Sequence, residues 1–197
     1  MLPSLPGLAP TGGTLIDERS RPDFRDVFGA LARSSVDVAS AVTRVRLSTL
    51  DFGPSDFERV ESLRVVVVEL NALTLDSEAR LIQADRSRAP RVAFFRQMLE
   101  EGRLEVRSAP LGGWSPNFTV FSTSGGPHAV VVGRHWFERP YPLRGPALAS
   151  VHFDDAARLA AKRFEELWGR AHDVGPALWS LLSQAERHGR RLHATAG

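Results

Sequence analysis

A chain of 197 residues is long enough for one well-packed domain and too short for two ordinary ones. Its 43% apolar and 24% charged residues are typical of a globular protein, and its apolar runs, such as Val65–Val68, fall far below the roughly 20 residues of a membrane-spanning helix. The absence of cysteine excludes disulfides, thiolate metal sites and a cysteine nucleophile. We therefore expect one cytoplasmic domain.

The formal net charge is only +2, yet the cationic residues are strongly biased in type. Lysine and arginine together number 25, and Lys162 is the single lysine. Arginine keeps its proton and offers a planar fork that suits phosphate or carboxylate groups. The codon usage of a GC-rich genome accounts for the same bias, so the arginine content alone does not indicate a ligand.

The first residues, MLPSLPGLAPTGG, are apolar but interrupted by Pro3, Pro6 and Pro10. They lack the basic start and the continuous apolar stretch of a secretory signal. We expect residues 1–20 to form a flexible, Pro-rich arm, which is a candidate contact for a protein partner.

Apolar periodicity predicts helices and strands in alternation along the rest of the chain. Phe24, Val27, Phe28 and Leu31 recur at helical spacing after Pro22. The four consecutive valines at 65–68 favour a strand covered on both faces. Helices are expected at 22–34, 54–63, 75–87, 89–101, 154–174 (with Asp154 as N-cap) and 176–188, and strands at 36–42, 44–52, 64–70, 103–110, 117–122, 128–133 and 148–153.

This order predicts an α/β fold, a single domain in which helices flank a mixed β-sheet. The domain is expected to span residues 21–174, and residues 175–197 are expected to form a C-terminal helix and a basic tail. Residues 123–127, TSGGP, join two of the strands and have the composition of a hairpin turn.

The second half of the chain resembles one half-domain of the phospholipase D-like superfamily. The resemblance covers about residues 23–174 and depends on the strand GRLEVRSAP, the hairpin, a strand ending in VVVG, and a helix that starts with Asp and ends in FEELWGRA. In active members a His-x-Lys-x4-Asp motif enters the hairpin, and a Gly-Ser-x-Asn stretch follows it. The resemblance implies that members with one motif per chain pair as homodimers.

The catalytic residues of that family are missing from this chain. The nucleophile position falls on Asn117, the lysine position on Thr119 and the aspartate position on Ser124, and of the Gly-Ser-x-Asn stretch only Gly133 is kept. An amide and a hydroxyl cannot replace an imidazole nucleophile and a cation. A shift of register does not restore the motif, since Lys162 follows Ala160 where a histidine is required. The standard reaction is therefore expected to be absent.

Other chemistries have no support in the spacing of residues. The six histidines form no His-x3-His or His-Glu-x2-His pattern, so we expect no metal site. No Gly-x-Ser-x-Gly elbow is present, and TSGGP lies between strands, whereas a phosphate-binding loop would open a helix. We expect no cofactor.

The best functional candidate is the loop GRHWFERPYPLRG, which interleaves arginines with aromatic residues. Arginine forks bind phosphate oxygens, and aromatic faces stack on bases or sugars. Aromatic and arginine residues are equally typical of a subunit contact, so packing remains an alternative. The residues that could contact nucleic acid are Arg134, Trp136, Arg139 and Arg144, with Arg190 and Arg191 of the tail.

We therefore expect a non-catalytic, homodimeric binding module. Asn117, Thr119, Arg134 and His135 are expected to line a remnant pocket for a phosphate-containing ligand. One alternative is a nucleic-acid-binding protein that uses the Arg/aromatic loop and the basic tail. Another is a structural subunit of a larger complex that docks through the N-terminal arm.

Overall fold

The computed structural model describes residues 13–16, 22–43, 52–68, 70, 89–109, 117–133 and 149–194, with backbone alone for 89 and 185–194. Five helices are assigned in the described residues: α1 (Phe24–Ser34), α2 (Pro54–Phe57), α4 (Ala89–Glu100), α5 (Asp155–Trp168) and α6 (Gly175–Ala194). The strands are β1 (Thr14–Ile16), β2 (Asp37–Val42), β3 (Ser62–Val67), β4 (Leu104–Ser108), β5 (Phe118–Thr123), β6 (Gly126–Val132), β7 (Ala149–Phe153) and β8 (His172–Asp173).

The described strands form one mixed sheet in the order β1-β7-β6-β5-β2-β3-β4-β8. The three central strands β2, β3 and β4 are parallel, and β5, β6 and β7 continue the sheet as antiparallel neighbours. The valine-rich strand β3 lies between β2 and β4, so both its edges are paired and both its faces are buried. The predicted α/β fold with a mixed sheet is confirmed.

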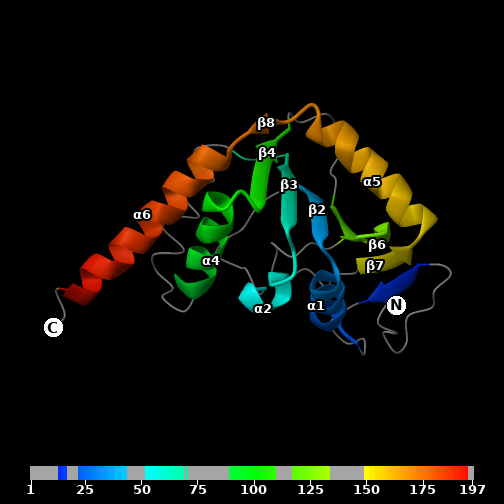
Figure 1. Cartoon of the computed structure of the whole chain (residues 1–197), viewed down its shortest axis with the longest axis horizontal. Coiled ribbons are helices and arrows are strands. Elements are labelled where there is room, and N and C mark those ends of the chain that lie inside the picture. Colours follow the sequence, from blue (N-terminus) through cyan, green and yellow to red (C-terminus); the bar gives the residue numbers. More distant parts are fainter. Residues whose placement is uncertain are drawn as a thin grey trace, which may run out of the picture.

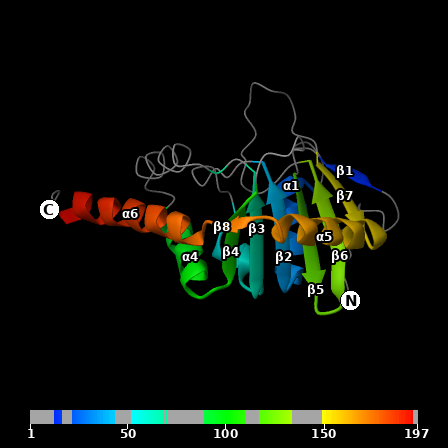
Figure 2. The same ribbon diagram turned by 90° about the horizontal axis from the view of Figure 1, so that it is seen from above.

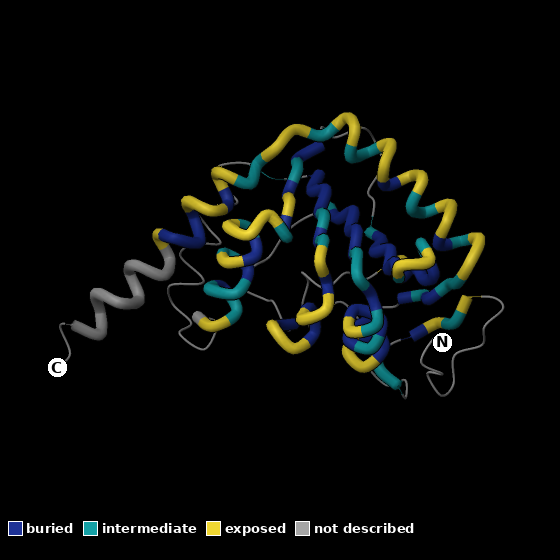
Figure 3. The backbone as a smooth tube through the Cα atoms, viewed as in Figure 1, coloured by how far each residue is buried: buried dark blue, intermediate teal, exposed yellow. Residues whose placement is uncertain are grey.

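Helices cover both faces of the sheet. Figure 1 shows α1, α2 and α4 on one side of the strands and α5 on the other, and Figure 3 shows that the most buried residues lie between these layers. The first half of α6 packs on α4 through Leu178, Leu181 and Leu182, which belong to the main core. The C-terminal helix thus shares the core of residues 21–174.

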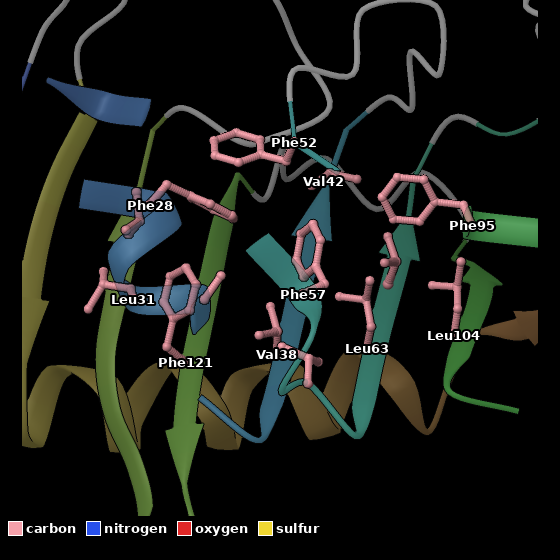
Figure 4. Close-up of a cluster of buried hydrophobic side chains, with 14 of the residues drawn as sticks. Phe28, Leu31, Val38, Val42, Phe52, Phe57, Leu63, Phe95, Leu104 and Phe121 are labelled. Atoms are coloured by element: carbon pink, nitrogen blue, oxygen red, sulfur yellow. The ribbon is translucent and has the colours of Figure 1, made fainter. Parts of the chain in front are cut away.

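The larger core joins α1, α2 and α4 to the sheet. Phe28 is central to it, with ring centroids 5.5 Å from Phe24, 4.7 Å from Phe52 and 5.0 Å from Phe121. Figure 4 shows Phe28, Phe52 and Phe121 with aliphatic neighbours such as Leu31 and Val38. The helical spacing of Phe24, Phe28 and Leu31 is what places them on the buried side of α1.

The smaller core lies beneath α5. The apolar stripe predicted for this helix, including Ala157 and Phe164, packs on Ala41, Val66 and Val130 of the sheet. Arg64 of β3 adds a polar contact, because its guanidinium lies 2.8 Å from Glu165 and 5.2 Å from the Phe164 ring centroid. One helix therefore holds this face of the central strands.

Several expected boundaries need correction. The helix expected at 54–63 ends at Phe57, because the chain turns over Val60 and enters β3 at Ser62. The final helix expected at 176–188 instead spans Gly175–Ala194. The turn expected at 123–127 is shortened to Ser124 and Gly125, with Gly126 already in β6 at a φ of 104°.

Asp154 occupies the N-cap position of α5, as the sequence predicts, but it does not cap the helix with its side chain. Its side chain makes no capping hydrogen bond, and its backbone adopts a φ of 53° and a ψ of −109°. The chain leaves β7 and enters α5 with no intervening loop, so this residue makes the sharp turn in place of capping.

Part of the range expected to be a flexible arm is ordered. Thr14–Ile16 pair antiparallel with β7 and close one edge of the sheet as β1. Residues 1–12 and 17–20 lie outside the described residues, as do the strand expected at 44–52 up to residue 51 and the helix expected at 75–87. In the described part of the chain, no helix is long and apolar enough to cross a membrane.

Candidate functional site

The site lies where the central parallel strands end. Figure 2 shows β2, β3 and β4 pointing towards one edge of the sheet, which we call the carboxyl edge. The antiparallel strand β5 starts there and β6 ends there, because Phe118 pairs with both Ala41 and Val132. In open α/β sheets, ligands bind outside the carboxyl ends of the strands.

Asn117 connects three strands at the carboxyl edge. Its Oδ1 accepts hydrogen bonds from the Thr43 backbone N–H at 3.1 Å and the Thr43 hydroxyl at 3.3 Å, just after β2 ends. Its backbone carbonyl accepts from the Gly133 N–H at 2.8 Å, just after β6 ends. These contacts fix both the main chain and the side chain of Asn117, which the resemblance assigns to the nucleophile position.

The amide nitrogen of Asn117 is left available by this arrangement. Both contacts from Thr43 are donors, so the carbonyl oxygen must face them and Nδ2 must face away. The side chain is half-buried, and Nδ2 neither makes a hydrogen bond to any described residue nor is buried without a partner. Asn117 therefore presents a neutral, oriented donor at the carboxyl edge.

Thr119, which the resemblance assigns to the lysine position, is fully buried. It pairs with Ser40 across β5 and β2, and the two hydroxyl oxygens lie 3.0 Å apart. Both residues have 0% exposure. Strand alternation points Thr119 towards the same side as Phe121, into the main core. In this structure Thr119 stabilises the pairing of two strands and has no surface for a ligand.

Ser124 and Gly133 lie at opposite ends of the hairpin. Ser124 is exposed in the β5–β6 turn, roughly 20 Å from Asn117 at the usual rise of a strand. Gly133 is hydrogen-bonded to Asn117. Its backbone φ is 100°, a value that residues other than glycine rarely adopt. The structure thus brings Gly133 to Asn117 and keeps Ser124 away.

Replacing Gly133 by alanine is expected to cost about 1–2 kcal/mol of unfolding free energy, since a Cβ strains a backbone with positive φ. Urea denaturation measures this loss. Gly169→Ala is the matched control, because Gly169 has a φ of −66° and an added Cβ there makes only ordinary contacts. Equal stability of the two variants would contradict the assigned backbone role of Gly133.

The remaining predicted site residues fall outside what the structure describes. Arg134, His135, Trp136, Arg139 and Arg144 lie in the interval 134–148, outside the described residues. Arg190 and Arg191 lie on α6, at positions described by backbone alone. Their roles in binding a ligand or nucleic acid stay predictions.

Ser40 and Thr43 were not singled out by the sequence analysis. They are small polar residues in and just after the otherwise apolar strand VDVASAV, and one of them contacts each of the positions assigned to the missing catalytic pair. Hydroxyl residues in a predicted central strand are the only signal that could have drawn attention to them. Their partners, in β5 and just before it, are more than 70 residues away in the sequence.

The histidines with described side chains, His128, His152 and His172, do not form a cluster. Within the described ranges, no group of three or more His, Asp or Glu residues could hold a metal ion. His152 of β7 lies 3.0 Å from the Ser150 hydroxyl, and His172 is exposed in β8. His128 of β6 is 7% exposed, and burial lowers its pKa, an effect that the charge of Asp154 partly opposes.

Comparison with solved structures identifies the fold. Nuc from Salmonella typhimurium, a phospholipase D family member, matches with a TM-score of 0.52 at 11% identity, over 82% of this chain and 97% of that chain. The fold is phospholipase D-like. This agrees with the resemblance seen in the strand order around the hairpin.

Two further structures are similar at lower scores. TrmBL2, an archaeal chromatin protein, matches with a TM-score of 0.49 at 12% identity, over 86% of this chain and 57% of that chain. NucT from Helicobacter pylori matches with a TM-score of 0.48 at 9% identity, over 82% of this chain and 98% of that chain. No protein-family model matches the chain, and no curated protein matches it in sequence.

Proposed function

We propose that this chain is a non-catalytic phospholipase D-like domain that binds a phosphate-containing ligand at its carboxyl edge. The observation that carries the proposal is the orientation of Asn117. Thr43 holds its carbonyl oxygen, so its Nδ2 is free to donate to an anionic oxygen at the place of the nucleophile. Because this donor is already oriented, little conformational entropy is lost when it binds a ligand.

The same positions argue against hydrolysis. A phosphodiesterase of this family needs a nucleophile and a cation on the phosphoryl oxygens. The amide of Asn117 is not a nucleophile, Thr119 is buried against Ser40, and no lysine follows a histidine by two residues anywhere in the sequence. Lys162 lies exposed on α5.

The variant Asn117→Asp tests the proposal directly. A carboxylate still accepts both hydrogen bonds from Thr43, but it replaces the donor with a negative charge. We expect the affinity for the phosphate-containing ligand to fall at least about tenfold, as loss of a hydrogen bond to a charged group predicts. The stability of the fold should be unchanged.

The binding experiment uses three probes: inorganic phosphate, a dialkyl phosphate and a short single-stranded oligonucleotide. The side-chain amide resonance of Asn117 reports contact in ¹⁵N NMR titrations. Gln184→Glu makes the same change of charge at an exposed position of α6 and should bind like the parent. Binding only to the oligonucleotide, with a steep salt dependence, would favour nucleic acid as the ligand. Equal affinity of Asn117→Asp and the parent would refute the role of Asn117.

We also propose a homodimer, as the phospholipase D-like resemblance implies for chains with one motif position. The solution mass, with and without the oligonucleotide, tests this directly. A mass twice that of the 21.6 kDa chain supports the dimer. A monomer would contradict it, and a much larger mass that falls on deletion of residues 1–12 would instead indicate a larger assembly.

A further inference from the structure

His128 is buried at the start of β6 in a way that the proposed function does not use. Its side chain is 7% exposed, and neither Nδ1 nor Nε2 has a hydrogen-bond partner. Buried polar atoms without partners are uncommon, and they cost free energy. A neutral imidazole bears this cost more easily than an imidazolium, so the site favours the neutral form.

The turn that follows β7 lies beside His128 and is strained. The Asp154 N–H donates to the His128 carbonyl at 3.2 Å, and Asp154 is the one described non-glycine residue with positive φ. Its carboxylate caps nothing, although the first bond of α5 runs from the Arg158 N–H to the Asp154 carbonyl. Asp154, whose carboxylate has no assigned bond, is thus bonded through its backbone to His128, whose buried imidazole has none either.

The first turn of α5 packs close to these two residues. His128 lies at a register shift between β6 and β5, two residues before Val130, and Val130 packs with the fully buried Ala157 of α5. We call His128, Asp154 and Ala157 the β6–α5 junction. A charge on His128 would be placed beside the turn through which the chain enters α5, because the Asp154 N–H is bonded to the His128 carbonyl.

Few other charges act at the junction. The neighbouring strand β5 carries no titratable side chain, and β7 carries His152, which is hydrogen-bonded to Ser150. The first turn of α5 carries Asp155 and Arg158, which pair with each other. Asp154 is therefore the group whose charge is felt by His128.

We propose that the β6–α5 junction is a proton-sensitive device, in which protonation of His128 draws the Asp154 carboxylate to it and releases the first turn of α5 from the sheet. Two changes favour release in acid: the imidazolium gains an ion pair, and Asp154 leaves a strained backbone conformation. Neutral His128 keeps the turn docked.

The sign of the pH dependence follows from burial. Because burial lowers the pKa of His128 in the folded state, the unfolded chain binds the proton more readily. The docked state is fully favoured above the ordinary histidine pKa of about 6.5 and is lost as the pH falls through and below it.

Hydrogen exchange of the full chain at about pH 5 and about pH 8 tests the proposal, with rates corrected for intrinsic exchange. Peptides covering the start of α5 should lose protection several-fold at the lower pH, while α1 keeps its protection. Uniform loss along the chain, or no change at the start of α5, would overturn the proposal.

Three variants sharpen this test. His128→Phe removes the titrating group and should abolish the pH dependence, whereas Asp154→Asn removes the ion-pair partner and should move the transition to lower pH. The control is His152→Gln, which changes a histidine of the neighbouring strand β7 and should behave like the parent. If His128→Phe does not fold, the direction in which Asp154→Asn shifts the pH of the transition decides whether the proposal holds. A pH dependence that survives in His128→Phe, or an unshifted one in Asp154→Asn, refutes the device.

Discussion

Replacing Thr119 by lysine is expected to lower the free energy of unfolding by about 3–5 kcal/mol, because the ammonium would be buried without a carboxylate partner. Thr119 has 0% exposure, and its neighbours in register are Ser40 and Val131. Restoring the family's lysine at this position therefore does not restore a phosphate-binding cation. It disrupts the pairing of β2 with β5.

Chemical denaturation measures this loss, and two controls separate its causes. Thr119→Val keeps the shape and removes the hydroxyl contact with Ser40, so it should cost no more than about 1–2 kcal/mol. Thr123→Lys introduces the same charge at the half-buried end of β5 and should cost no more than about 1 kcal/mol. A stable Thr119→Lys variant that gains phosphodiesterase activity together with Asn117→His would contradict the closed site.

Truncating Phe28 to alanine is expected to cost about 3–5 kcal/mol of unfolding free energy, by lost apolar burial and by the cavity left behind. Its ring is fully buried and touches the rings of Phe24, Phe52 and Phe121. These contacts join α1 to β5, the strand that presents Asn117. Loss of the ring therefore weakens the support of the site as well as the core.

The midpoint of urea unfolding, at unchanged slope, reports this effect. Phe28→Leu retains most of the buried volume and should cost clearly less. Leu159→Ala truncates an apolar side chain that is 71% exposed on α5 and should change stability by no more than about 0.5 kcal/mol. A cost for Phe28→Ala that matches the cost for Leu159→Ala would show that this cluster does not support the fold.

Local sequence patterns were sufficient for much of the fold. The spacing of Phe24, Phe28 and Leu31 predicted α1, and the run of valines predicted a central strand with both faces buried. The order of elements around the hairpin predicted the phospholipase D-like fold. These features depend on residues close together in the chain, where periodicity is informative.

The burial and the orientation of the site residues could not be predicted from local sequence patterns. Whether Thr119 lines a pocket or fills the core depends on Ser40, which is 79 residues away in sequence. The orientation of Asn117 depends on Thr43, 74 residues away, and the turn at Asp154 depends on how closely α5 follows β7. Such pairings are set by strand register, which one sequence does not reveal.

The proposed function has two parts: the carboxyl edge binds phosphate-containing ligands, and it does not cleave them. Incubating the parent chain with a chromogenic phosphodiester, alongside the NMR titration of Asn117 with a dialkyl phosphate, tests both halves of it. We expect the amide signal of Asn117 to shift on binding and the release of chromophore to match the buffer rate. Turnover above the buffer rate that is lost in Asn117→Asp would show that the carboxyl edge is catalytic and would contradict the proposed function.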